Sequence, residues 1–287
     1  TGYIPEKLLC YPTNSFESRE FEVSYRGRAY PYWHGQLGLE KWLIAQRFKV
    51  DSDKYGLKTN ISYYEKDRLY GERWFDLIRN SVAVLGVESG ASYLDIDGKL
   101  SATVECYTAL TMAEEEVSLC NYTNIYETML KDNPNEIDIR QISPRCFEAI
   151  ALRTGLILYE GNYSGVLKPW DHYIPLKKDH SNMDEVVKAL KNNKFMAQLI
   201  SKTYADIACS DKYSYQTFIQ KFDSIINQNF TSKYKVASSP YDHSRFYEEY
   251  TIQSFQMQHL IFDKSRRLRS YIPHSVKSKI KNYLGKL

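Results

Sequence analysis

Residues 142–167 combine a carboxylate, a short apolar run and a glycine-containing loop. The pattern predicts a helix from Pro144 to Arg153, a buried strand from Leu156 to Tyr159 and a loop toward Leu167. On such a helix the Glu148 carboxylate can accept hydrogen bonds from both hydroxyls of a ribose. Backbone N–H groups around Ser164, Gly165 and Val166 can hold a phosphate, because the loop presents unpaired donors. Taken by themselves, these features favour a solvent-facing carboxylate and a simple turn.

The elements that must position these residues alternate between strand and helix. The predicted strands are 21–25, 57–63, 82–87, 156–159 and 172–176, and the predicted helices are 39–55, 72–80, 101–131, 144–153, 183–190, 194–208 and 214–227. This alternation indicates an α/β fold, a doubly wound parallel sheet of Rossmann-like type. The loops 26–38, 88–98 and 160–170 should then share the carboxyl edge of the sheet, where ligands bind in such folds.

Three blocks of sequence follow one another in a recognisable order. They are Tyr25-Arg26-Gly27-Arg28, then residues 85–92 (LGVESGAS) with Asp95-Ile96-Asp97-Gly98 close behind, and then the 144–149 helix (PRCFEA) followed by residues 172–176 (HYIPL). Together they resemble the C-terminal domain of GT-B glycosyltransferases, in particular the group-1-like transferases of bacterial polysaccharide synthesis. The resemblance spans residues 21–227 and implies a nucleotide-sugar-binding domain.

The resemblance also implies roles for single residues. Glu148 would hold the ribose of the donor, and the loop Tyr163-Ser164-Gly165 would lie beside the diphosphate or the sugar. Arg28, and with it Lys41, would neutralise the diphosphate leaving group, which departs with growing negative charge that cations stabilise. A solvated loop charge is the alternative for Arg28.

The sequence departs from the family in one respect. Many retaining GT-B enzymes carry two glutamates separated by seven residues, but Arg140 occupies the position eight before Glu148. The stereochemical outcome of transfer is therefore left open, and no catalytic base is assigned. His34 and Glu88 are the two candidates, and a surface histidine is the alternative for His34.

Asp95-Ile96-Asp97 matches the D-x-D triplet by which the other glycosyltransferase fold, GT-A, binds a metal and a diphosphate. A turn with capping carboxylates explains it equally simply and is preferred here, because such triplets are common by chance. We therefore expect no cofactor and no divalent metal, and keep a GT-A enzyme using Asp95 and Asp97 as an alternative. Glu88-Ser89-Gly90 does not complete the G-x-S-x-G elbow of serine hydrolases.

Composition and charge limit the remaining possibilities. With 43% apolar and 25% charged residues the 287-residue chain is typical of a folded globular protein. The five cysteines are widely spaced and form no C-x-x-C pair, which favours reduced thiols in a cytosolic protein. No apolar run reaches the roughly 18 residues of a membrane span.

The C-terminal tail is basic. Residues 259–287 hold eight Lys or Arg and one Asp, so their net charge is +7. The rest of the chain carries −4, which gives the net charge of +3 for the whole chain. Residues 275–287 fit an amphipathic helix with an apolar stripe flanked by lysines, the pattern of a helix lying on a membrane surface. We expect residues 264–287 to attach the chain to an anionic membrane. Packing of the stripe on the protein itself is the alternative.

These observations divide the chain into a lead-in or linker (1–20), a Rossmann-like nucleotide-sugar-binding domain (21–228) and a helical basic C-terminal extension (229–287). The expected function is transfer of a sugar from a nucleotide-sugar donor to a cell-surface polysaccharide or a lipid-linked glycan, with this chain supplying the donor-binding half. Too little sequence precedes residue 21 to form an acceptor-binding half. A non-catalytic sugar-nucleotide-binding module is the alternative. The expected location is the cytoplasm, at the inner face of the membrane, with no nucleic-acid partner.

Overall fold

The computed structural model describes residues 3–111 and 118–229, which fall into two units. The first holds residues 3–96 and 118–224 and contains the whole candidate site. The second includes helix α4 (Lys99–Thr111) and residues 225–229, the end of helix α9 (Tyr215–Asn229). The predicted basic tail at 264–287 lies outside the described residues.

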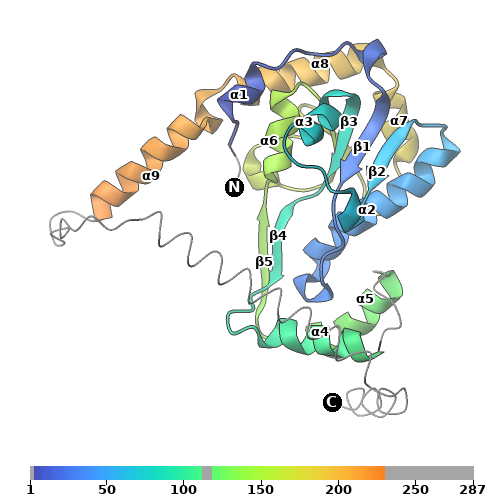
Figure 1. Ribbon diagram of the computed structural model, residues 1–287, viewed down its shortest axis with the longest axis vertical. Helices are drawn as coiled ribbons and strands as arrows, with labels where there is room; N and C mark the ends of the chain where they lie inside the picture. Colours follow the sequence, from blue (N-terminus) through green and yellow to red (C-terminus); the bar gives the residue numbers. More distant parts are fainter. Residues whose placement is uncertain (1–2, 112–117, 230–287) are drawn as a thin grey trace. The chain divides into compact units, whose positions relative to one another are not determined.

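A five-stranded parallel sheet forms the centre of the first unit (Figure 1). Its order is β2-β1-β3-β6-β7, with β1 Phe21–Arg26, β2 Thr59–Ser62, β3 Ser81–Gly86, β6 Gly155–Tyr159 and β7 Ile174–Leu176. Neighbouring strands are all paired in parallel. The prediction of a doubly wound, Rossmann-like α/β fold is confirmed.

Helices cover both faces of this sheet, because successive side chains of a strand point to opposite sides. On one face, Leu85 and Ile157 pack with helices α2 (Gly35–Lys54), α7 (Met183–Leu190) and α8 (Asn193–Thr203). On the other, Val84 and Leu158 pack with α3 (Glu72–Arg79) and α6 (Pro144–Ala151). Both sides of each central strand are therefore buried, which explains the nearly continuous apolar runs of β3 and β6.

Residues 88–98, predicted as a loop, contain a strand instead. Strand β4 (Ser89–Tyr93) pairs antiparallel with β5 (Glu136–Gln141) as a separate two-stranded sheet. The small residues of β4 and the mostly exposed side chains of β5 lack the apolar pattern that predicts strands. Gly90 is required there, since it has φ +145° and a Cβ would lie 1.7 Å from the Ile139 carbonyl oxygen.

Two other segments differ from the prediction. The helix expected over 101–131 is divided into α4, α5 (Leu119–Ile125) and a π-helical turn over Tyr126–Leu130. Helix α5 starts afresh because the Ser118 hydroxyl accepts a hydrogen bond from the Asn121 N–H at 3.1 Å and so caps it. The lead-in is packed on the domain: Leu8, in the short helix α1 (Glu6–Leu9), is fully buried in the core beside α6.

The strand order also marks where a ligand can enter. From β1 the chain passes through α2 to β2 on one side of β1, whereas β3 lies on its other side. The connections leaving β1 and β3 therefore run in opposite directions and leave a crevice at the carboxyl ends of these two strands. Arg26 ends β1 and Gly86 ends β3, so the crevice lies between the loops that follow these residues.

Candidate functional site

A cavity of about 320 Å³ occupies this crevice. This volume lies at the lower end of the range of about 300–1,000 Å³ typical of ligand pockets. Three segments supply most of its wall: the end of β1 with the loop after it, the end of β3 with the residues after it, and the N-terminal part of α6 with Ser143 before it. Their lining residues are Arg26, Gly27, Arg28, Tyr30, Gly86, Val87, Ser89, Ser143, Pro144, Arg145, Cys146 and Glu148. The wall is completed by Lys41 from α2, Arg68 and Leu69 from the β2–α3 connection, Trp74 from α3, and Tyr25, Val84, Leu85, Leu156 and Leu158 from the central strands.

Five of the lining side chains are cationic, and within the described residues only Arg68 has an ion-pair partner. Arg68 forms an ion pair with Glu65 at 2.7 Å, and Arg26 is bound to the main chain and side chain of Asn60. Arg28, Lys41 and Arg145 have no ion pair with any carboxylate in the described parts of the chain.

These three cations are close enough to repel one another. The pKa of Lys41 is lowered, first by burial and further by the charges of Arg145 and Arg28, although Tyr30 acts in the opposite direction. An anion bound among them would relieve this repulsion, and the first turn of α6 adds the partial positive charge of a helix N-terminus. The cavity is thus built to receive a negatively charged group.

Tyr30 lies between two of the cations. The Lys41 Nζ is 4.2 Å and the Arg28 Cζ 4.8 Å from the centre of its ring. Burial raises the pKa of the Tyr30 phenol, but the charges of Lys41 and Arg28 and their hydrogen bonds to it outweigh burial and lower it. The aromatic ring therefore holds both cations at the mouth of the β1 loop.

His34 lies beside this group without lining the cavity. Its ring stacks on Trp33 at 3.9 Å and meets the edge of Tyr30 at 4.9 Å. Burial, together with the charges of Lys41 and Arg28, lowers the pKa of His34 to about 4. The imidazole is therefore neutral at pH 7, and it can accept a proton but lends no positive charge to the site.

Among the described residues, Glu148 is the one carboxylate that lines the cavity. It is half-buried, and its Oε2 accepts a hydrogen bond from the Trp74 indole N–H at 2.8 Å. The structure thus brings together three of the residues singled out from the sequence: Arg28, Lys41 and Glu148. Helix α6 carries Glu148 toward the cavity because the opposite side of this helix, with Phe147 and Ile150, is buried in the core.

The loop of Tyr163, Ser164 and Gly165 lies elsewhere, and none of the three lines the cavity. Tyr163 is fully buried, and its hydroxyl donates to the Tyr159 carbonyl oxygen at 2.6 Å. The Ser164 hydroxyl accepts from the Ile142 N–H at 3.1 Å, and the Gly165 N–H donates to the Asn162 carbonyl at 2.8 Å. These hydrogen-bonding groups have partners within the protein and stabilise the conformation of the loop.

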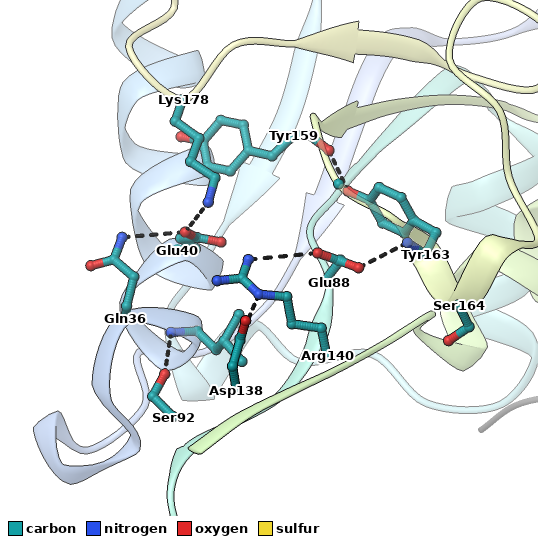
Figure 2. A network of polar contacts seen from close by, with 12 residues as sticks. Gln36, Glu40, Glu88, Ser92, Asp138, Arg140, Tyr159, Tyr163, Ser164 and Lys178 are labelled. Atoms are coloured by element: carbon teal, nitrogen blue, oxygen red, sulfur yellow. Dashed lines mark hydrogen bonds and ion pairs between the residues drawn. The ribbon is translucent and has the colours of Figure 1, made fainter. Parts of the chain in front are cut away.

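Glu88 joins that loop to the β4–β5 sheet, as Figure 2 shows. Its buried carboxylate accepts the Tyr163 N–H at 2.8 Å and lies 3.6 Å from the Arg140 Nη1. Arg140 in turn binds Asp138 at 2.6 Å. Glu88 does not line the cavity, and both of its oxygens face partners within the protein, so it acts here as a structural anchor of the two segments.

Asp95 and Asp97 are also absent from the cavity wall. Asp97 accepts the Lys99 N–H at 3.1 Å and forms an ion pair with the Lys99 Nζ at 2.6 Å, as in a capped turn that starts helix α4. Within residues 3–111 and 118–229, no group of three His, Cys, Asp or Glu side chains is arranged to hold a metal ion.

Three residues of the site are missing from the sequence-based assignment: Tyr30, Trp74 and Arg145. From the sequence, Trp74 is one of the apolar residues of a short predicted helix. Arg145 belongs to a motif in which the resemblance implies a role only for Glu148. The available signal is local, since each of the three stands just after a strand or in the first turn of a helix, where side chains reach the carboxyl edge of the sheet.

Comparisons with known proteins add little to this geometry. No family model matches the chain, and no curated protein matches it. Among the similar solved structures is the crystal structure of TarM, at 13% sequence identity and a TM-score of 0.40. The alignment covers 75% of this chain and 37% of that one, so this chain spans well under half of its length. What the site binds is therefore inferred from its own residues.

Proposed function

We propose that this chain is the donor-binding half of a glycosyltransferase and that its cavity holds the nucleoside diphosphate of a nucleotide sugar. The observation that carries the proposal is that Arg28, Lys41 and Arg145 lie without ion-pair partners in the described chain, beside Glu148, whose carboxylate lines the same cavity. The cations suit a diphosphate, and the carboxylate suits the two hydroxyls of a ribose. These residues lie at the crevice between the carboxyl ends of β1 and β3, and nucleotides bind at this position in open α/β sheets.

This arrangement supports transfer of the sugar in a simple way. An acceptor hydroxyl attacks the anomeric carbon, the bond from that carbon to the diphosphate oxygen breaks, and the electron pair leaves with the diphosphate. Arg28, Lys41 and Arg145 would stabilise the charge that grows on the leaving group. The base that takes the proton from the acceptor is not assigned to this chain. Neutral His34 remains a candidate, whereas Glu88 is engaged by Tyr163 and Arg140.

The acceptor in this proposal is a cell-surface polysaccharide or a lipid-linked glycan, met at the inner face of the membrane. No helix within the described residues is long and apolar enough to cross a membrane. Attachment to an anionic membrane through residues 264–287 stays a prediction, because that segment lies outside the described parts of the chain.

Glu148→Ala is expected to raise the dissociation constant for the preferred nucleoside diphosphate more than tenfold. The substitution removes a charge-assisted hydrogen bond to the ribose, which is worth about 1.5–3 kcal/mol. Isothermal titration calorimetry with UDP, GDP, ADP and TDP measures this effect and shows which nucleobase the site prefers. Glu185→Ala, an exposed glutamate on α7, is the matched control. An unchanged dissociation constant in a folded Glu148→Ala protein would remove the ribose-binding role.

Nucleotide binding is expected to persist in EDTA, because cations and backbone donors meet the diphosphate without a metal. The same titration with and without chelator tests this. If EDTA abolishes binding, and Asp95→Asn or Asp97→Asn does the same, the metal-dependent GT-A alternative replaces the present proposal.

A further inference from the structure

Trp74 stands between two charged residues of the cavity. It belongs to the first turn of α3, is half-buried and lines the cavity. Its indole N–H donates to Glu148 at 2.8 Å, while the guanidinium carbon of Arg145 lies 5.3 Å from the centre of its ring. Arg145 is flanked on another side by the ring of Tyr25, at 5.0 Å. One side chain thus contacts both the cation and the carboxylate.

Arg145 and Glu148 would otherwise be expected to pair with each other. They stand three residues apart on α6, the spacing at which side chains of a helix are neighbours and opposite charges attract. Both lie in the described chain, and no ion pair joins them. The contacts of Trp74 favour this separation: its N–H binds one carboxylate oxygen of Glu148, and its ring, like that of Tyr25, offers the guanidinium of Arg145 a competing surface.

We infer that Trp74 is a positioning residue that keeps Arg145 and Glu148 from neutralising each other, so that the cavity offers phosphate a cation, and hydroxyls a carboxylate, that are not paired with each other. The inference rests on the proposed nucleotide site and adds to it a residue that sets how that site discriminates its ligand. Without Trp74, Arg145 would turn to Glu148, and an entering phosphate would have to compete with that carboxylate.

Two substitutions of Trp74 separate its two contacts. Trp74→Phe keeps a ring under Arg145 but removes the N–H that binds Glu148, so affinity for the nucleoside diphosphate should fall more than affinity for inorganic pyrophosphate, which has no ribose. Trp74→Leu removes both contacts and should weaken pyrophosphate binding by roughly tenfold, the equivalent of one charge-assisted hydrogen bond. Calorimetry with both ligands gives the two dissociation constants.

The decisive measurement is rescue by a second substitution. In Trp74→Leu/Glu148→Gln the charge that captures Arg145 is gone, so pyrophosphate affinity should return toward that of the wild type. A loss caused only by disturbed folding of α3 would not be restored in this way. Trp170→Leu, which changes an exposed tryptophan outside the cavity wall, is the matched control and should bind like the wild type.

The outcomes distinguish this inference from the proposed function. Wild-type protein that binds nucleoside diphosphate, together with a double variant as weak as Trp74→Leu, would overturn the role of Trp74 and leave the site intact. If the wild type binds a nucleoside diphosphate no more tightly than pyrophosphate, the proposed nucleotide-sugar donor is contradicted. The rescue measured with pyrophosphate still tests the role of Trp74 in that case. Wild-type protein that binds neither ligand would overturn both.

Discussion

Replacing Arg28 and Lys41 together by alanine is expected to raise the dissociation constant for a nucleoside diphosphate at least about a hundredfold. Each cation would give a charge-assisted hydrogen bond to phosphate, worth about 1.5–3 kcal/mol, and two such bonds amount to about 3 kcal/mol or more. Because Lys41 and Arg28 repel each other in the ligand-free protein, the folded state itself should tolerate their removal well.

Lys49→Ala/Lys54→Ala is the matched control for this pair. Both lysines are exposed on the same helix, α2, and neither lines the cavity. This control should bind nucleotide like the wild type in the same titrations. Binding by the wild type should also weaken as salt is added, since ions screen the charges. An unchanged dissociation constant in a folded Arg28→Ala/Lys41→Ala protein would place the diphosphate elsewhere.

Phe48→Ala is expected to lower the free energy of unfolding by about 3–5 kcal/mol. Phe48 is fully buried on the inner side of α2, in the core that α2 forms with the sheet, α7 and α8. Truncation of its ring would leave a cavity that the surrounding strands cannot fill. Denaturation in urea, followed by circular dichroism, measures the change.

Val50→Ala provides the comparison on the same helix. Val50 is 55% exposed, so its truncation should change the free energy of unfolding by well under about 1 kcal/mol. A Phe48→Ala protein as stable as Val50→Ala would show that α2 is not held against the sheet as described. The orientation of α2 matters for function too, because it carries Lys41 into the cavity.

The two predictions concern different parts of the molecule, the charged cavity and the apolar core. The first concerns cations whose mutual repulsion destabilises the folded protein but which stabilise a bound anion. The second concerns the apolar packing that keeps these charges in place despite that repulsion. The helices that bear Lys41 and Arg145 pack on the two faces of the sheet through buried apolar residues, and this packing holds both cations in the site.

Much of the fold could be predicted from the sequence. Short apolar runs such as β3 and β6 are typical of strands covered on both faces, and segments of helical period stand between them, so local patterns predict the parallel α/β sheet. The β4–β5 sheet could not be predicted in this way. Its residues are small or polar, and its pairing depends on Gly90 meeting Ile139 across 49 positions of sequence.

The candidate site is divided in the same way. Arg28, Lys41 and Glu148 could be named from the sequence, because the resemblance to a known family implies a role for each of them. That they line one cavity is a result of the strand order, which brings the ends of β1 and β3 together. The sequence gives no sign that Tyr163 is a core residue, since a tyrosine in a glycine-containing loop looks the same whether it faces ligand or interior.

The sequence by itself determined the type of fold and the kinds of group available to bind a ligand, because both depend on local periodicity and residue type. Only the tertiary structure decided which of these groups act together. Trp74 and Glu148 are 74 positions apart, yet a single hydrogen bond joins them, and the same indole separates Glu148 from Arg145, its neighbour on the helix. Such contacts arise when two helices pack on one face of the sheet, and no pattern within either helix encodes them.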